Sequence, residues 1–113
     1  MTQNENKKMF VVQIKPNSNS LAERNLKRQG FETFAPKMII TKRKNNKFIQ
    51  QKVDVFPGYI FVYFNPQLVN WSVINSTYGV SKILSFNQRP SEIRPDLASE
   101  IKNRYEISKS CIA

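Results

Sequence analysis

Residues 9–14 (MFVVQI) are rich in residues that favour β-strands, and Gln13 is the single polar residue among them. Side chains of a strand point alternately to its two faces. The even positions of this segment are all apolar: Phe10, Val12 and Ile14. We therefore expect these three side chains to point into the core and Gln13 to lie on the opposite face.

A second strand is predicted within residues 56–64 (FPGYIFVYF), where apolar side chains occupy both faces. One face carries Ile60, Val62 and Phe64. The other face carries Tyr59, Phe61 and Tyr63. A strand presents only one face to a given core, so the aromatic face needs a partner of a different kind.

Between these strands, residues 20–30 have the pattern of a helix. Ser20 and Glu23 have the spacing of a capping box, and Gly30 can adopt the left-handed conformation that ends a helix. The buried stripe is expected to contain Leu21, Ala22 and Leu26. The side chains expected to face solvent are Arg24, Lys27 and Arg28.

Two further helices are predicted in the second half of the chain. Asn65 and Pro66 are typical of a helix start, and this helix is expected to continue to Asn75. The last helix is expected to begin at Pro95. Its packed stripe recurs every four residues, at Leu97, Ile101 and Tyr105.

A long hairpin is predicted from residues 31–44 and 47–56, which are joined by Asn45-Asn46. Asparagine tolerates the positive φ angles of a tight turn. The tip holds no acidic residue, and its cations are Lys42, Arg43, Lys44 and Lys47. A run of cations of this kind favours contact with a polyanion through charge over reading of a base sequence.

A final strand is predicted at residues 79–86, which gives the element order β-α-β-β-β-α-β-α. This order predicts an α+β fold in which helices pack mainly on one face of an antiparallel β-sheet. The other face, with Tyr59 and Phe61, is expected to stay open. The predicted domain covers residues 9–107, between a flexible leader (1–8) and a tail or linker start (108–113).

The 113-residue chain carries a formal net charge of +10, which is distributed unevenly. Residues 1–55 hold 12 Lys/Arg and 4 Asp/Glu, whereas residues 56–113 hold 6 and 4. A positive field concentrated in one half attracts polyanions through steering and counterion release. We therefore expect nucleic acid to lie near the first half of the chain.

The composition argues against an enzyme. Histidine is absent, which excludes Ser/His and Cys/His nucleophile pairs and the usual zinc sites that contain histidine. The three glycines are isolated, so they cannot form a glycine-rich phosphate loop. The single cysteine, Cys111, allows no internal disulfide. No apolar run is long enough to span a bilayer, and we expect a cytoplasmic protein without a cofactor or metal.

The aromatic face of the strand at residues 59–64 has two main interpretations. In RNA-recognition domains the signature strand reads K/R-G-F/Y-G/A-F-V-x-F/Y, and PGYIFVYF fits most of its positions. Tyr59 and Phe61 would then stack on bases of RNA or single-stranded DNA. Against this interpretation, Pro57 replaces the signature cation, and Ile60 is bulkier than the expected Gly or Ala.

The second interpretation is a protein-binding pocket. Aromatic residues on an open sheet face form an apolar patch that can accept the tip of a partner's helix or helical hairpin. Val11, Gln13 and Val80 would lie around this patch. A protein-binding pocket does not require a cation at position 57. A simpler alternative is that the terminal helix covers Tyr59 and Phe61 as part of the core.

The chain resembles the N-terminal domain of NusG-type transcription elongation factors over about residues 9–107. The resemblance rests on FPGYIFV, preceded by a strand with VVQ and followed by WSVINSTYGV and LSF. The segments APKMIITKRKNNK and INSTYGVSKILSF are most similar to specialised RfaH-like paralogues. The resemblance implies a monomeric factor that bridges the DNA channel of RNA polymerase and suppresses pausing or termination. Family members usually continue into a KOW-type barrel, which residues 1–113 do not include.

The resemblance also implies three groups of contact residues. The group for the polymerase clamp helices is Tyr59, Phe61, Phe86, Gln13 and Val80. The group for the opposite polymerase lobe is Asn70, Trp71 and Ser72. The group for non-template or upstream DNA is Lys15, Arg24, Lys27, Arg28, Asn75, Thr77 and Tyr78. Simple packing is the alternative for Trp71, and an ordinary solvated helix face is the alternative for the helix cations.

Overall fold

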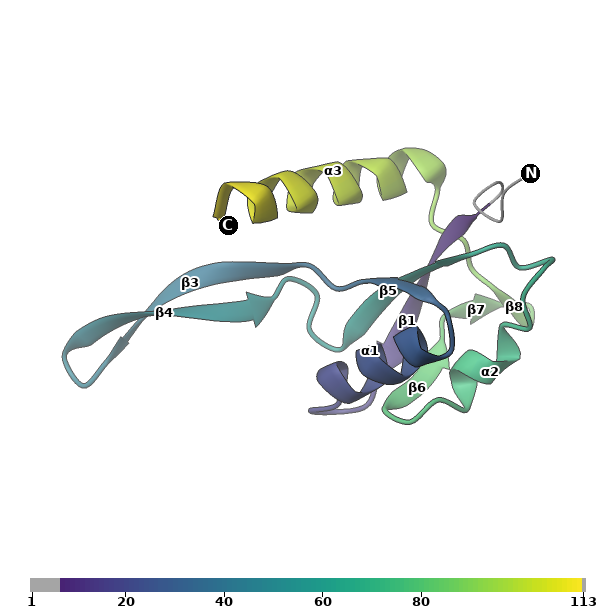
Figure 1. Cartoon of the computed structure of the whole chain (residues 1–113), viewed down its shortest axis with the longest axis horizontal. Coiled ribbons are helices and arrows are strands. Elements are labelled where there is room, and N and C mark those ends of the chain that lie inside the picture. The colour runs from purple at the N-terminus through teal and green to yellow at the C-terminus, as the bar shows by residue number, and fades with distance from the viewer. Residues whose placement is uncertain (1–6, 113) are drawn as a thin grey trace.

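The structure is a computed structural model that describes residues 7–112, with residues 106–112 described by their helical backbone alone (Figure 1). It confirms the predicted α+β fold with antiparallel pairing. The central sheet has the strand order β2-β5-β1-β6. Its strands are β1 (Lys8–Ile14), β2 (Glu32–Phe34), β5 (Tyr59–Phe64) and β6 (Val80–Ile83).

Two helices cover one face of this sheet, α1 (Asn19–Arg28) and α2 (Ser72–Asn75) (Figure 1). The strand faces predicted from alternation are confirmed here. The sheet contributes Phe10, Val12, Ile14, Ile60, Val62 and Phe64 to the core, all nearly inaccessible to solvent. Phe10 and Phe64 stack with their ring centroids 4.4 Å apart. Ala22 and Leu26 of α1 and Ile74 of α2 pack on this layer.

The other sheet face, which we call the second face, is covered at one end by α3 (Pro95–Ile112). The ring of Tyr105 meets the ring of Phe56 edge to face, with centroids 5.9 Å apart. The Lys102 ammonium lies 5.0 Å from the centre of the Tyr63 ring. The expectation that this whole face stays open is therefore wrong at the end nearest α3.

The predicted hairpin forms a sheet of its own, made of β3 (Lys37–Lys44) and β4 (Lys47–Asp54). It projects away from the rest of the molecule (Figure 1). With the hairpin included, the molecule measures 53 Å along its longest axis. The turn is confirmed, because Asn45 and Asn46 have φ angles of 53° and 64°. The predicted strand at residues 31–44 is interrupted before β3, because Pro36 has no N–H and restricts the residue that precedes it.

Several expected element boundaries are wrong. Helix α1 begins at Asn19, so Ser20 lies inside the helix and the expected capping box does not form. The Glu23 carboxylate instead accepts a hydrogen bond from the Thr33 hydroxyl at 3.3 Å. The Asn65 side chain accepts a hydrogen bond from the Gln67 N–H at 2.9 Å, but this turn does not continue as a helix. Only Ser72–Asn75 is α-helical in the segment where a helix from Pro66 was expected.

Further differences concern the ends of the domain. The strand expected at residues 79–86 is divided into β6 and β7 (Ser85–Phe86), and β7 pairs with β8 (Arg89–Pro90). Of the expected leader 1–8, residues 1–6 lie outside the described residues, and Lys8 begins β1. Helix α3 begins at Pro95 as predicted and its backbone continues past residue 107 to Ile112. Two leucines expected in buried stripes, Leu21 and Leu97, are exposed.

An ion pair lies at the start of α3. The Arg94 guanidinium donates to the Asp96 carboxylate at 2.7 Å, and this contact lowers the pKa of Asp96 and raises that of Arg94. The N–H of Leu97 also lowers the pKa of Asp96. A negative charge in the first turn of a helix is favourable because it meets the positive end of the helix dipole.

Within residues 7–112, no helix is both long enough and apolar enough to cross a membrane.

Gly79 supports a close contact between the turn before β6 and α1. Its φ angle is +92°, and a Cβ at this position would lie 2.9 Å from the backbone nitrogen of Ala22. Gly58 has a similar φ angle of +84°, but no atom lies within 4 Å of a Cβ placed there. A side chain at position 58 would therefore cause backbone strain alone, whereas a side chain at position 79 would cause backbone strain and steric overlap with α1.

We expect Gly58→Ala to lower the free energy of unfolding by about 1–2 kcal/mol, the usual cost of a left-handed residue that carries a Cβ. Gly79→Ala should cost roughly 1–3 kcal/mol more, because α1 must also shift to relieve the overlap. Urea unfolding of both variants measures the difference. Equal losses would show that α1 does not pack tightly on Gly79.

Candidate functional site

The uncovered end of the second face holds a row of three side chains from neighbouring strands. Gln13 of β1 pairs with Tyr59 of β5 on one side and with Lys82 of β6 on the other. Residues that pair directly across antiparallel strands point to the same face. Tyr59 is 39% exposed, Gln13 is half-buried and Lys82 is exposed, so a partner can reach this row from solvent.

Phe61 lies on the same face as Tyr59 but is only 5% exposed. Its ring contacts Phe56 edge to face at 5.2 Å, and Phe34 lies 6.3 Å away on the neighbouring strand. Because Phe56 in turn contacts Tyr105, α3 closes this aromatic cluster from above. The side chain of Phe61 is therefore enclosed in this aromatic cluster and offers little surface to a partner.

Val80 and Phe86 are not brought beside Tyr59. Val80 pairs with Ile14 and lies in the core, because the pairing of β1 with β6 shifts between Gln13 and Ile14. This irregularity lets both Val80 and Ile83 face inward although they are three residues apart. Phe86 is 74% exposed in β7, and none of the ring contacts among the described residues joins it to Tyr59 or Phe61.

Lys82 is a member of the row that the predicted contact groups do not include. Simple alternation in residues 79–86 places Val80 and Lys82 on one face. Because the pairing irregularity turns Val80 into the core, only Lys82 remains beside Gln13. The bulge depends on pairing with β1, and the local sequence carries no signal that would predict it.

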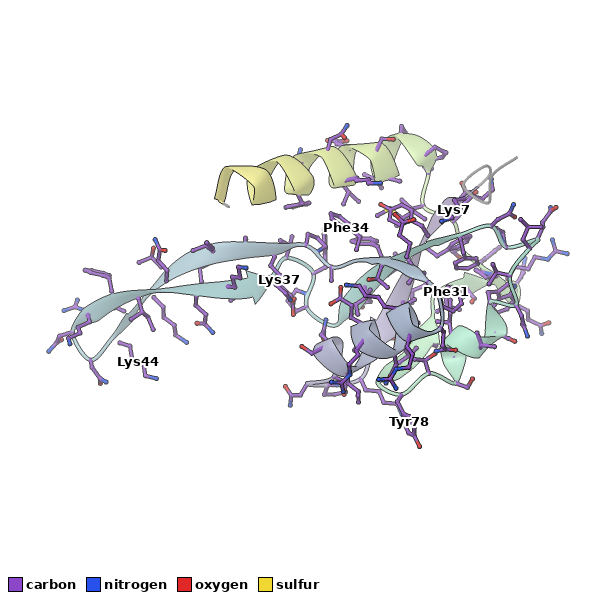
Figure 2. All side chains as sticks on the ribbon, viewed as in Figure 1. Lys7, Phe31, Phe34, Lys37, Lys44 and Tyr78 are labelled. Atoms are coloured by element: carbon purple, nitrogen blue, oxygen red, sulfur yellow. The ribbon has the colours of Figure 1, made fainter. Side chains whose placement is uncertain are left out.

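A second candidate surface forms where α1 meets the turn at residues 77–79. The Gln29 amide donates to the Thr77 hydroxyl at 2.8 Å, and the Asn25 amide donates to the Tyr78 carbonyl at 3.5 Å. The Lys15 N–H donates to the Gly79 carbonyl at 2.9 Å. These contacts hold the exposed ring of Tyr78 beside the first helix, and the ring projects away from the body of the molecule (Figure 2).

The cations near this turn fall into two groups. Lys15, Arg24 and Arg28 are exposed and make no ion pair within the described part of the chain. Lys27 instead lies 3.5 Å from the Glu23 carboxylate. Lys27 and Glu23 both line a cavity of about 630 Å³ between α1, the base of the hairpin and Tyr105. The structure thus separates Lys27 from the other three cations.

Thr77 and Asn75 are engaged in holding the fold. Thr77 is buried, and its hydroxyl also donates to the Val73 carbonyl at 2.9 Å. The Asn75 side-chain oxygen accepts a hydrogen bond from the Ile83 N–H at 2.8 Å, which fixes the end of α2 against β6. Both residues therefore position the turn that carries Tyr78.

The loop before α2 presents a third candidate surface. The Asn70 side-chain oxygen accepts hydrogen bonds from the Ser72 hydroxyl at 2.6 Å and from the Ser72 N–H at 3.3 Å. Both residues are exposed. Trp71 is half-buried and packs against the core, as its packing interpretation predicts. The exposed part of its ring leaves room for a partner as well.

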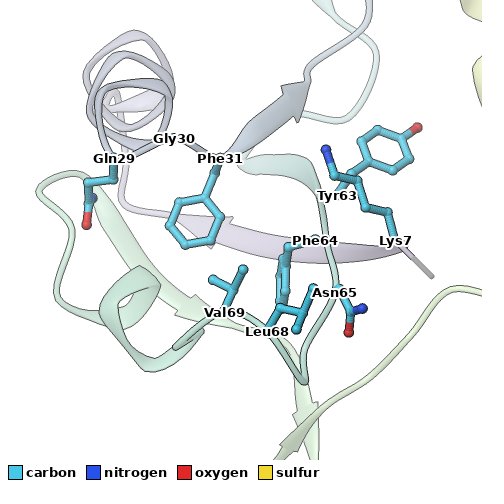
Figure 3. A pocket seen from close by; sticks show the side chains of 9 residues that line it. All are labelled: Lys7, Gln29, Gly30, Phe31, Tyr63, Phe64, Asn65, Leu68 and Val69. Carbon is cyan, nitrogen blue, oxygen red and sulfur yellow. The ribbon is translucent and has the colours of Figure 1, made fainter. Parts of the chain in front are cut away.

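A hollow of about 200 Å³ lies outside all three surfaces. Figure 3 shows Phe31, Phe64 and Val69 around it, with Lys7 and Tyr63 at one side. Lys7 forms an ion pair with Glu32 at 3.3 Å. The sequence predicts no function for the residues around this hollow.

Residues 7–102 match the family described as "Transcription termination factor nusG". The match covers most of the 113-residue chain, so this protein belongs to the NusG family of transcription termination and elongation factors. These factors interact with RNA polymerase and are not enzymes. Family membership places the chain with the transcription machinery in the cytoplasm or nucleoid.

We expect Asn75→Ala to lower the free energy of unfolding by about 1–3 kcal/mol, because the Ile83 N–H loses its acceptor in a partly buried position. Asn75→Asp is the matched control, since a carboxylate oxygen can still accept this hydrogen bond. Thermal or urea unfolding measures both. If the two variants were equally unstable, the hydrogen bond would not explain the loss.

Proposed function

We propose that this protein binds the clamp helices of the largest RNA polymerase subunit through the uncovered end of the second face. One observation carries the proposal: Tyr59 remains 39% exposed beside Gln13 and Lys82, at the end of the sheet that α3 leaves free. The family as a whole acts on RNA polymerase, and a helical tip needs an apolar anchor of this kind.

The physical chemistry of the row suits a protein partner. Tyrosine is enriched among residues that contribute most to binding, because it buries a large apolar area and loses little conformational freedom. On the same face, Phe61 of the Tyr59 strand packs beside Phe34 of the neighbouring strand, with ring centroids 6.3 Å apart. Phe86 is a second exposed aromatic residue; it does not lie beside Tyr59, and its proposed contact with the clamp helices rests on the family resemblance.

The same arrangement disfavours base stacking on the second face. Phe61 is enclosed by other aromatic rings, so it cannot offer its face to a base. Pro57, at the position of the signature cation, cannot pair with a phosphate. The alternative of an RNA- or single-stranded-DNA-binding module that uses this face is therefore the weaker one.

We expect Tyr59→Ala and Phe86→Ala each to weaken binding to a clamp-helix fragment, by about 1–3 kcal/mol if they act as anchors. Phe48→Ala is the matched control, because Phe48 is 75% exposed, almost equal to Phe86, but lies on the distant hairpin. Isothermal titration calorimetry with the fragment measures the three variants. The proposal fails if Tyr59→Ala binds the fragment as the unmodified chain does, or if only oligonucleotide binding is lost.

On the opposite side of the DNA channel, we propose that the loop Asn70-Trp71-Ser72 contacts the facing polymerase lobe. Two hydrogen bonds from Ser72 fix the conformation of this loop, so little entropy is lost when a partner binds it. Contacts to both sides of the channel would hold the enzyme closed. A closed enzyme pauses and terminates less readily, so the factor would raise processivity as an antiterminator, in the manner of RfaH-like paralogues that serve specialised operons.

We further propose that the surface with Lys15, Arg24, Arg28 and Tyr78 binds the exposed non-template DNA strand. Among the described residues, no carboxylate forms an ion pair with these cations, and the Tyr78 ring is exposed and can stack on a base. Lys27 lies in the cleft beside Glu23 and is expected to contribute less. Asn75 and Thr77 support this surface by fixing the turn.

We expect the single variants Arg24→Ala and Arg28→Ala each to weaken binding to single-stranded DNA and to lower the slope of log K against log salt by about 0.7 for each phosphate that is no longer neutralised. Lys27→Ala should change both values less, because Lys27 is already paired. Fluorescence anisotropy at several salt concentrations gives these values. Equal effects from all three positions would contradict the division of the cations into two groups.

A further inference from the structure

The pairing of β3 with β4 sorts the distal side chains of the hairpin onto two faces. Arg43 pairs with Phe48 and Thr41 pairs with Gln50, so these four residues share one face, which we call the Phe48 face. The opposite face, which we call the lysine face, carries Lys42, Lys44, Lys47 and Ile49. The sequence showed a run of cations here, but only the pairing separates an aromatic side from a lysine side.

The charge of the distal hairpin is uncompensated. Residues 41–50 contain no acidic residue, and the acid that follows them in β4, Asp54, is paired with Lys37 at the base of the hairpin. Among the described residues, no carboxylate forms an ion pair with Lys42, Arg43, Lys44 or Lys47. A positive potential therefore extends from the tip, where it selects for a polyanionic partner.

Phe48 is the unusual residue of this region. Its side chain is 75% exposed and stands directly across the ribbon from Arg43. An aromatic ring that stays exposed in the folded protein contributes little to the free energy of folding. An aromatic ring beside cations is the combination that binds unpaired nucleotides, because the ring stacks on a base while the cations meet phosphates.

We propose that the distal hairpin binds an unpaired stretch of nucleic acid. Phe48 stacks on one base, the Arg43 guanidinium lies over the neighbouring base or phosphate, and Thr41 and Gln50 offer hydrogen bonds to base edges. The lysine face neutralises the phosphates on either side. An unpaired strand is required because the face of a base is accessible only outside a stacked duplex.

This site is separate from the surface proposed for the non-template strand. Figure 2 shows Lys44 on the outer part of the hairpin, whereas Tyr78 projects from the body near α1. The inference therefore does not rest on the proposed function: the hairpin could bind a strand whether or not α1 does. RNA and single-stranded DNA share the chemistry that the tip recognises, and separate probes distinguish them.

The test uses the whole chain with Arg24→Ala, Arg28→Ala and Tyr78→Ala as background, so that binding at α1 is removed. Labelled pyrimidine-rich RNA and DNA strands of about 12 nucleotides, a length within the range that one single-strand-binding module covers, are titrated by anisotropy. A duplex of matched length is titrated in the same way. In this background, Phe48→Leu should weaken binding of the unpaired strands between about 5-fold and 150-fold, the loss expected for one stacked base. Phe48→Trp, which keeps an aromatic face, should restore it.

Two further measurements separate charge from stacking. Lys44→Gln with Lys47→Gln should lower the salt slope by about 0.7 for each phosphate left without a cation, whereas Phe48→Leu should leave the slope unchanged. Photo-crosslinking with thio-substituted pyrimidines should label residues 42–50. Binding of only RNA or only DNA would support the proposal and identify the strand. The proposal is overturned if the duplex binds as tightly as the single strands, or if Phe48→Leu binds them as well as its background does.

Discussion

The antiparallel pairing of β1 with β5 is the interaction on which the rest of the structure depends. Both strands lie in the middle of the sheet, and their core faces interlock through Phe10, Val12, Ile60 and Val62. Apolar burial of this kind is the main favourable term in folding. Because the same ladder fixes Gln13 opposite Tyr59, it also sets the row proposed to bind polymerase. The main core and the proposed polymerase contact therefore lie on opposite faces of one pair of strands.

The close contact of α1 with the turn at Gly79 extends this arrangement to the proposed DNA surface. Only glycine can bring the two backbones so near, and hydrogen bonds from Asn25 and Gln29 fix the turn from the side of the helix. Tyr78 and Asn25, which are far apart in the sequence, thereby come into contact. Helix α3 has the complementary effect, since it closes one end of the second face and leaves Tyr59 accessible.

The hairpin is stabilised by different interactions from those of the domain body. It has almost no buried side chains, and its two strands are held by backbone pairing and by contacts at the base. A two-stranded ribbon of this kind gains little stability in isolation, so its shape depends on the turn at Asn45-Asn46 and on its attachment beside Pro36. Such a ribbon can place cations and an exposed aromatic ring far from the core at low cost to the fold.

The sequence by itself determined the fold class, the inward parity of β1 and β5, the tight turn of the hairpin and the start of α3, because alternation, turn residues and proline act locally. It also determined the uneven charge. The tertiary structure alone decided that Val80 enters the core and that Phe61 is enclosed. These outcomes depend on strand pairing and helix packing between distant segments, so local patterns carry no signal for them.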